Sequence, residues 1–196
     1  MANDNDKIIR HAGIDRLFHW VMAATMIVLL VTSLLPVLGV RFAWYEAHWI
    51  AGVILTLVIL LHIVRSLVWQ RLITITPRPS DLSSALPGKY TPAQKLMHLG
   101  WTVAILAAIV TGLVLTVKAG VPFLTRDPYI YTLRTWGVMT LLHDLAALLS
   151  VFLILVHVYF GILPEKRAYL RAMVFGWVGR GELKSAHDLD RVARGD

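Results

Sequence analysis

The chain has 196 residues, 57% of them hydrophobic, and carries a formal net charge of +7. Its mean hydropathy of +0.66 is too high for an ordinary soluble domain, and its length suits one helical membrane bundle. Because the sequence contains no cysteine, it excludes iron–sulfur clusters, disulfides and covalently attached c-type haem within this chain. The positive charge alone is compatible with nucleic-acid binding, but the distribution of the cations indicates membrane topology instead.

Four apolar spans can be marked along the chain, each close to the ~20 residues that a membrane-spanning helix needs. They cover residues 17–38, 47–69, 96–117 and 136–163, and the first is expected to remain as an uncleaved anchor. A Pro- and Ser-rich linker, residues 73–95, joins the second span to the third. The sequence therefore predicts an all-α membrane protein: a four-transmembrane-helix bundle over residues 17–163, preceded by segment 1–16 and followed by segment 164–196.

The cations are distributed unequally between the two ends of these spans. Fifteen Lys and Arg residues fall on the side of the termini and the linker, and only four fall on the other. The positive-inside rule then places both termini and the linker in the cytoplasm. Aromatic residues typical of a membrane interface cluster at the opposite, outer face: Trp44, Tyr45, Trp49, Tyr129, Tyr131 and Trp136.

The segment after the fourth span mixes cations with aromatic and aliphatic residues. We expect residues 165–180 to lie along the inner headgroups as an interfacial helix, serving either as a plain juxtamembrane anchor or as a docking surface. The residues that follow Gly181 are expected to form a mobile tail.

Six histidines lie in or at the ends of the spans, at two depths. His143 and His157 are fourteen positions apart. On a helix, this spacing places the two side chains within about 40° of the same face and ~21 Å apart along the axis. Ionisable groups at membrane depth are costly unless they have a partner or a function. Two stacked b-type haems, each held by one His from each of two helices, would require such an arrangement. The outer layer contains His48 and His143, and the inner layer contains His19, His62, His98 and His157.

Spacing alone pairs the outer histidines but leaves the inner pair open. His48 and His143 form the outer pair with little competition. On the inner side His157 is selected by the stripe that it shares with His143, and its partner is either His62 or His19. Geometry favours His62, because it shares a stripe with His48.

The chain resembles the di-haem cytochrome b subunits of bacterial respiratory enzymes. These are the gamma subunit of membrane-bound formate dehydrogenase and its thiosulfate reductase and nickel–iron hydrogenase relatives, within the cytochrome b561 superfamily. The resemblance covers residues 16–159 and is carried by RLFHW, AHWIAG, KYTPAQK and LLHDLAALLSVFLILVHVY. It implies two haem b groups in a bacterial inner membrane, with His19 rather than His62 paired with His157. His62 would then be a spare imidazole near a propionate or a proton path. Asp144, which departs from the family motif, would accept an imidazole N–H or face the outer water.

The same resemblance implies a quinone site near the inner haem, at the start of the third helix. The corresponding residues are Thr91, Gln94, Lys95 and His98. Thr91 stands where formate dehydrogenase relatives have Asn, and the alternative interpretation is a capped helix start with a snorkelling lysine. Cations near the headgroups are candidates for binding haem propionates or are simple topology determinants: Arg16, Arg65 and Lys95 inside, and Arg41 and Arg134 outside.

Three functions of different classes follow from these features. The first is an electron-carrying subunit that links an outer redox partner, such as an iron–sulfur protein, to quinone on the cytoplasmic side. The second is a self-contained quinone oxidoreductase of the b561 type that uses a small donor or acceptor such as superoxide. The third, a haem-free divalent metal transporter, is disfavoured because its spans nearly lack the carboxylates that would share metal ligation.

Overall fold

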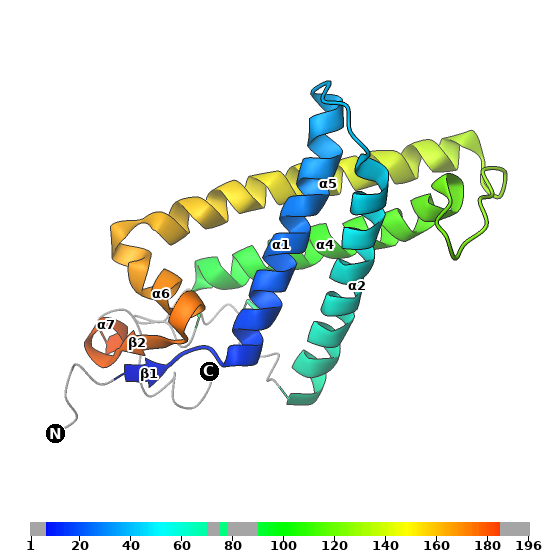
Figure 1. The fold of residues 1–196 in the computed structure, drawn as a ribbon. Helices are drawn as coiled ribbons and strands as arrows, with labels where there is room; N and C mark the ends of the chain where they lie inside the picture. Colours follow the sequence, from blue (N-terminus) through cyan, green and yellow to red (C-terminus); the bar gives the residue numbers. More distant parts are fainter. Residues whose placement is uncertain (1–6, 70–74, 78–89, 185–196) are drawn as a thin grey trace. The chain divides into compact units, whose positions relative to one another are not determined.

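The computed structural model describes residues 7–69, 75–77 and 90–184. Four long helices account for most of it: α1 (Gly13–Val37), α2 (Trp44–Trp69), α4 (Pro92–Ala119) and α5 (Leu133–Ile162) (Figure 1). The all-α prediction with four membrane-spanning helices is confirmed. Most of the predicted linker and of the C-terminal tail lies outside the described residues, and so do five of the cations used to assign topology: Arg71, Arg78, Lys89, Arg191 and Arg194.

Each helix begins three or four residues before the predicted apolar span, because its first turn contains a charged residue that the apolar span left out. At α4 the hydroxyl of Thr91 accepts the Gln94 N–H (3.2 Å), and the Gln94 amide oxygen accepts the Thr91 N–H (2.9 Å). This reciprocal capping box, with Pro92 at the first helical position, starts the helix ahead of the apolar run. At α5 the Thr132 hydroxyl caps the N–H of Thr135 (3.2 Å).

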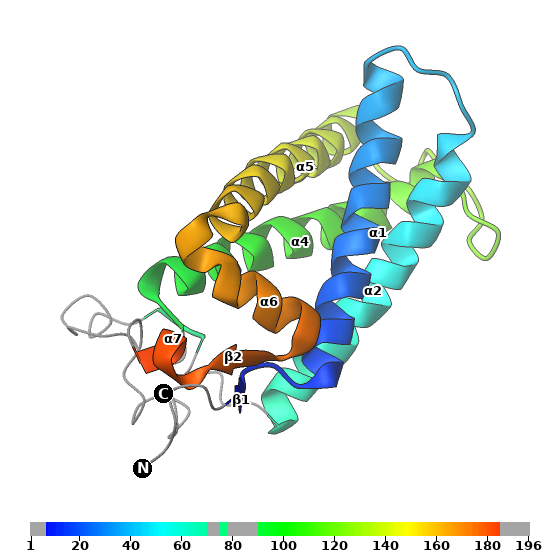
Figure 2. The same ribbon diagram turned by 60° about the vertical axis from the view of Figure 1, so that its left-hand side comes forward.

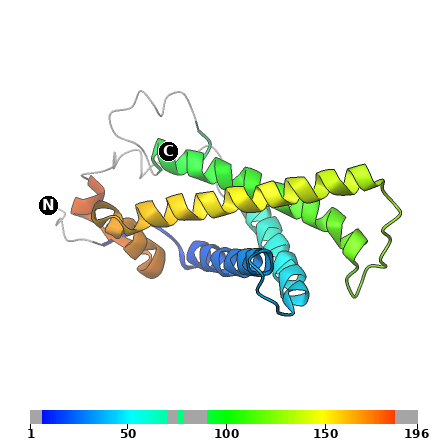
Figure 3. The ribbon, with the colours of Figure 1, turned by 90° about the horizontal axis from the view of Figure 1, so that it is seen from above.

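The four helices have the length and composition of membrane spans. Their most apolar windows have mean hydropathies between 2.2 and 2.5, and many of their Leu, Ile and Val side chains are exposed on the protein surface. A soluble protein rarely leaves so much apolar surface uncovered, whereas a bilayer covers it. The longest helix, α5, runs without interruption for 30 residues (Figure 3). At ~1.5 Å per residue it exceeds the ~30 Å hydrocarbon layer and reaches both headgroup regions.

The chain divides into two compact units. One contains residues 1–19, 62–100 and 154–196 and is called here the terminal unit; the other contains residues 20–61 and 101–153 and is called the central unit. Each long helix contributes a segment to both. The histidines divide in the way that the sequence predicts: His48 and His143 fall in the central unit, and His19, His62, His98 and His157 fall in the terminal unit.

A small sheet in the terminal unit joins the two ends of the chain. Strand β1 (Lys7–Ile9) pairs antiparallel with β2 (Trp177–Gly179), with Ile8 opposite Val178 (Figure 2). Val178 and Ala172 of helix α6 (Arg167–Phe175) form its core and are almost fully buried. The sequence did not predict this sheet, because three-residue strands carry too little pattern to be recognised.

The segment predicted as one interfacial helix therefore contains several short elements. A 3-10 turn, η2 (Pro164–Lys166), leads into α6, and Gly176 ends α6 before β2 and the short helix α7 (Arg180–Lys184). Gly176 has a φ of +91°, and a Cβ there would lie 3.1 Å from the carbonyl oxygen of His11. The positive φ and the close carbonyl both favour glycine at this position, where the chain turns toward β1.

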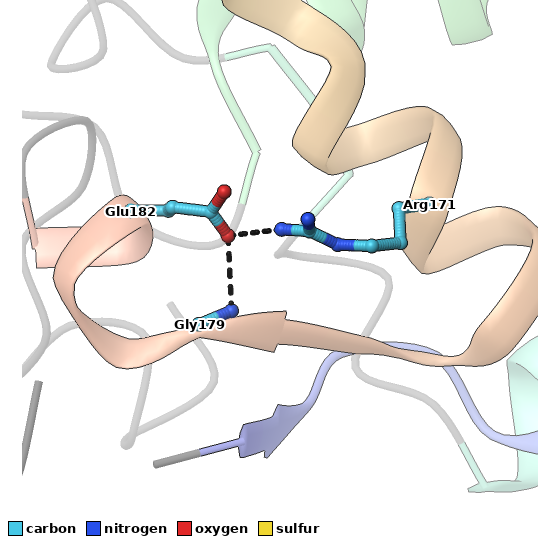
Figure 4. A network of polar contacts seen from close by, with 3 residues as sticks. All are labelled: Arg171, Gly179 and Glu182. Atoms are coloured by element: carbon cyan, nitrogen blue, oxygen red, sulfur yellow. Dashed lines mark hydrogen bonds and ion pairs between the residues drawn. The ribbon is translucent and has the colours of Figure 1, made fainter. Parts of the chain in front are cut away.

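Charged residues close the turn between β2 and α7. Glu182 forms an ion pair with Arg171 of α6 and accepts the backbone N–H of Gly179 at 3.1 Å (Figure 4). The hydrogen bond from Arg171 holds the pKa of Glu182 below its usual value. The ring of Trp177 contacts two cations, with Lys7 at 4.3 Å and Arg171 at 5.0 Å from its centre.

In the central unit, the connection between α4 and α5 is built on Trp136. This residue was expected at the membrane interface, but only 2% of it is exposed. Its indole N–H donates to the carbonyl of Pro128 (2.9 Å), and the Lys118 ammonium lies 5.6 Å from its ring centre. The connection folds back over the indole, so that the Pro128 carbonyl accepts the only hydrogen that the indole can donate. Tyr129 and Phe123 of the same connection are 92% and 71% exposed, as interfacial aromatics would be.

Candidate functional site

Two imidazoles meet in the central unit. His48 on α2 and His143 on α5 have ring centres 6.2 Å apart, with their planes inclined at 71°. Both are partly buried. This is the pair that spacing alone predicted for the outer layer.

Two further imidazoles meet in the terminal unit at the same separation. His19 on α1 and His157 on α5 have ring centres 6.2 Å apart, with planes inclined at 43°. His62 of α2 contacts the ring of Phe18 edge-on, at 6.0 Å between centres. The structure therefore places His19, the residue implied by the family resemblance, against His157.

The separation within each pair fits one transition-metal ion between two imidazoles. An imidazole nitrogen binds a metal at about 2 Å and its ring centre lies about 1 Å further back, so two rings on opposite sides of one metal have centres about 6 Å apart. Among residues 7–69, 75–77 and 90–184, no group of three or more His, Cys, Asp or Glu is placed to hold a bare ion. Haem iron needs only two protein ligands, because the porphyrin supplies the other four. The donor set therefore fits haem better than zinc.

A glycine makes room beside one of these rings. A Cβ on Gly112 of α4 would lie 3.1 Å from Cε1 of His143 and 3.7 Å from its Nδ1. Glycine at this position lets the α4 backbone approach the imidazole more closely than any other residue would allow.

Each histidine of the central pair also contacts a buried threonine on another helix. The Thr32 hydroxyl of α1 lies 2.9 Å from Nδ1 of His48, and the Thr111 hydroxyl of α4 lies 2.9 Å from Nδ1 of His143. Asp144, considered as an acceptor for an imidazole, is exposed, because the residue after a histidine lies about 100° around the helix. Sequence spacing did not identify the threonines, since they approach across helices.

The two inner-face arginines predicted to contact propionates, Arg16 and Arg65, both have protein partners in the terminal unit. Arg65 of α2 forms an ion pair with Asp15 of α1. Arg16 donates to the carbonyl of Val174 at 2.6 Å, near the end of α6, where carbonyls lack partners within the helix. Arg65 therefore links two membrane helices, and Arg16 anchors α6 to α1.

The residues predicted to contact quinone have differing environments. Thr91 and Gln94 bond to each other in the capping box of α4, which agrees with the alternative interpretation of a capped helix start. Lys95 is buried, with 4% of its surface exposed, and therefore does not snorkel. His98 lies close enough to His62 for their charges to interact.

Sequence reasoning missed the environment of Arg10, which it treated only as a topology determinant. Arg10 is 8% exposed, and its guanidinium lies 4.9 Å from the ring centre of Tyr169. Burial lowers the pKa of Arg10 and raises the pKa of Tyr90 and of Tyr169, while the charge of Arg10 opposes the shift at both tyrosines. This cluster keeps one cation inside the terminal unit beside two neutral phenols.

Two comparisons with known proteins bear on these sites. A family model described as prokaryotic cytochrome b561 matches residues 10–176. The matched range includes all four long helices and the four paired histidines. Comparison with curated proteins gives no match.

Proposed function

The chain belongs to the prokaryotic cytochrome b561 family, and from this premise we propose that it is a di-haem cytochrome b linking a redox partner to the quinone pool. The four apolar helices and the family indicate a multi-pass bacterial membrane protein. The family further implies that the protein binds b-type haem and transfers electrons across the membrane. The number of haems, the partner and the quinone are the parts that we propose.

Two haems are supported by the equal ring separation in the two histidine pairs. Both pairs have ring centres 6.2 Å apart, although they lie in different units and join α5 to different helices. We assign His48 and His143 as the axial ligands in the central unit and His19 and His157 as those in the terminal unit. When bound, haem b supplies an iron that exchanges one electron reversibly.

The remaining residues of the chain hold and insulate these sites. The apolar helices exclude water and ions from the imidazoles, and Gly112 keeps α4 close to His143. In the terminal unit, Arg65 and Arg16 are proposed to contact haem propionates while keeping their links to Asp15 and Val174. A guanidinium has five N–H donors, so one partner leaves others available for a carboxylate.

We assign quinone exchange to the terminal unit, near the start of α4. We propose that His98, an imidazole that interacts with His62, and the buried Lys95 bind and protonate the quinone, beside Thr91 and Gln94 of the capping box. His62, close to His98, provides a second imidazole for proton transfer. The positive-inside rule places this end of the helices, with both termini, in the cytoplasm.

A redox partner is proposed at the opposite, outer face. The connection between α4 and α5 exposes Phe123 and Tyr129, and Leu133 at the start of α5 is 88% exposed. Large exposed aromatic and aliphatic side chains suit a protein interface as well as they suit the headgroup region. The second candidate, a self-contained oxidoreductase acting on a small molecule such as superoxide, is favoured by one observation: the description of the matching family, prokaryotic cytochrome b561, names no partner complex. Purification from native membranes distinguishes them, because only the first copurifies with a redox subunit.

Haem stoichiometry tests the central proposal. A pyridine haemochrome assay on the purified chain should return about two haems b per polypeptide. His143→Ala should remove the central haem and His157→Ala the terminal haem, each leaving about one. A wild-type value near zero or one, or full retention in either variant, would overturn the assignment.

A further inference from the structure

Two buried threonines contact the histidines of the central pair in the same way. Thr32 and Thr111 are 4% and 5% exposed, and each hydroxyl lies 2.9 Å from Nδ1 of its histidine. We infer that Thr32 and Thr111 are positioning residues that fix the tautomer of His48 and His143, so that each presents the lone pair of Nε2 to the haem iron. The inference rests on the proposed function and concerns the central haem alone.

The direction of these hydrogen bonds follows from a count of hydrogen atoms. A threonine hydroxyl has one hydrogen to donate and two lone pairs that accept. The Thr32 hydroxyl lies 2.7 Å from the carbonyl oxygen of Val28, and the Thr111 hydroxyl lies 2.6 Å from that of Ala107. Carbonyl oxygens only accept, so each hydroxyl hydrogen is already used within its own helix.

The hydroxyl can therefore only accept a hydrogen from the imidazole. Nδ1 of His48 and of His143 must carry that hydrogen, and a neutral imidazole with hydrogen on Nδ1 has its lone pair on Nε2. In the opposite tautomer, the Nδ1 lone pair would face a hydroxyl lone pair inside the membrane, and both groups would lose a partner. Each ring is thus prepared to bind a metal through Nε2 before haem arrives.

The same hydrogen bond affects the bound state. A ligand that donates its remote N–H to an acceptor becomes more basic and binds metal more firmly, and loss of such a partner typically weakens metal affinity by about 10- to 100-fold. A more basic imidazole favours the oxidised iron. Removing either threonine should therefore weaken haem binding in the central unit and raise the midpoint potential of the central haem.

Thr25 provides a matched control on the same helix as Thr32. It is also buried, with 8% of its surface exposed, and its hydroxyl bonds to the carbonyls of Val21 and Met22 at 2.9 and 3.0 Å. Like Thr32, Thr25 is buried and its hydroxyl bonds to the backbone of its own helix. Within the described part of the chain, its hydroxyl contacts no histidine. Thr25→Val thus reports the cost of losing a buried hydroxyl of α1 by itself.

The test uses the full chain in detergent with its haems loaded. Thr32→Val and Thr111→Val should lose one of the two haems to excess apomyoglobin about 10- to 100-fold faster than wild type. In redox titration, the retained central haem should show a higher potential than in wild type. Thr32→Ser and Thr111→Ser, which keep the acceptor, should restore both properties. If the valine variants do not accumulate, the alanine variants are measured against Thr25→Ala in the same two assays.

The outcomes separate this inference from the proposed function. If the Thr32 and Thr111 variants behave like the Thr25 variant while wild type binds two haems and His143→Ala binds one, the tautomer role is wrong and the di-haem assignment stands. If His143→Ala keeps both haems, the ligand assignment itself is wrong. Failure of the serine variants to restore haem retention would also overturn the inference, since serine supplies the same hydroxyl.

Discussion

Gly112 stands directly against the ring of His143, so the smallest possible enlargement there tests the central site. In Gly112→Ala the new methyl carbon would begin 3.1 Å from Cε1 of His143. Carbon atoms in ordinary contact are about 3.5 Å apart or more, so the ring or the α4 backbone must shift by roughly 0.4 Å. The neighbouring hydrogen bond from Nδ1 of His143 to the Thr111 hydroxyl, now 2.9 Å, would be stretched or bent by the same movement.

The expected magnitude follows from the cost of overpacking. An extra methyl group in a well-packed interior typically costs about 1–3 kcal/mol, whereas replacing a helical glycine by alanine returns roughly 0.5–1 kcal/mol of helix propensity. The net loss of folding stability is therefore about 0–2.5 kcal/mol, and haem binding is weakened by up to roughly 70-fold where this whole cost falls on the haem-bound state.

Haem transfer to apomyoglobin and the spectrum of the central haem measure this effect. Gly137→Ala is the matched control, because Gly137 lies in α5 and a Cβ there would meet no atom within 4 Å. We expect Gly137→Ala to behave as wild type and Gly112→Ala to release the central haem faster, with the terminal haem unaffected. Equal release from both variants would refute the proposed close approach of α4 to the imidazole.

Three further predictions concern the terminal unit. His19→Ala should lose one haem while His62→Ala keeps two in the pyridine haemochrome assay; the reverse result would make His62 the axial ligand. Lys95→Gln should leave both haem spectra intact and slow reoxidation of the reduced cytochrome by a quinone analogue; unchanged reoxidation would move the quinone site elsewhere. Because the folded pKa of Glu182 lies below its unfolded value, its ion pair stabilises the β1–β2 region above the unfolded pKa and is lost as pH falls through the folded pKa. Glu182→Gln should abolish the acid-induced part of the change in Trp177 fluorescence, a surface effect of less than about 1 kcal/mol, and a persisting acid transition would contradict this role.

The membrane architecture was readable from the amino-acid sequence. An unbroken run of about 20 apolar residues spans a bilayer as a helix, so the number of long helices, and their ends to within four residues, follow from composition. Helical periodicity placed His143 and His157 on one stripe, and depth separated the outer pair from the inner group. The start of α4 was also readable, since Thr91 and Gln94 have capping-box spacing.

Contacts between helices were decided only by the tertiary structure. Depth and periodicity cannot show how far a helix is rotated about its axis, so they left His19 and His62 as alternatives. Helix packing places the ring centre of His19 at 6.2 Å from that of His157. For the same reason, the sequence could not predict the roles of Thr32 and Thr111, which contact their histidines from neighbouring helices. It also could not predict the role of Gly112, which matters only because His143 lies against it. The pairing of β1 with β2 joins opposite ends of the chain, and no local pattern encodes an interaction over that separation. The sequence by itself determined properties of single helices in a bilayer. Only the tertiary structure decided the distances between side chains on different helices.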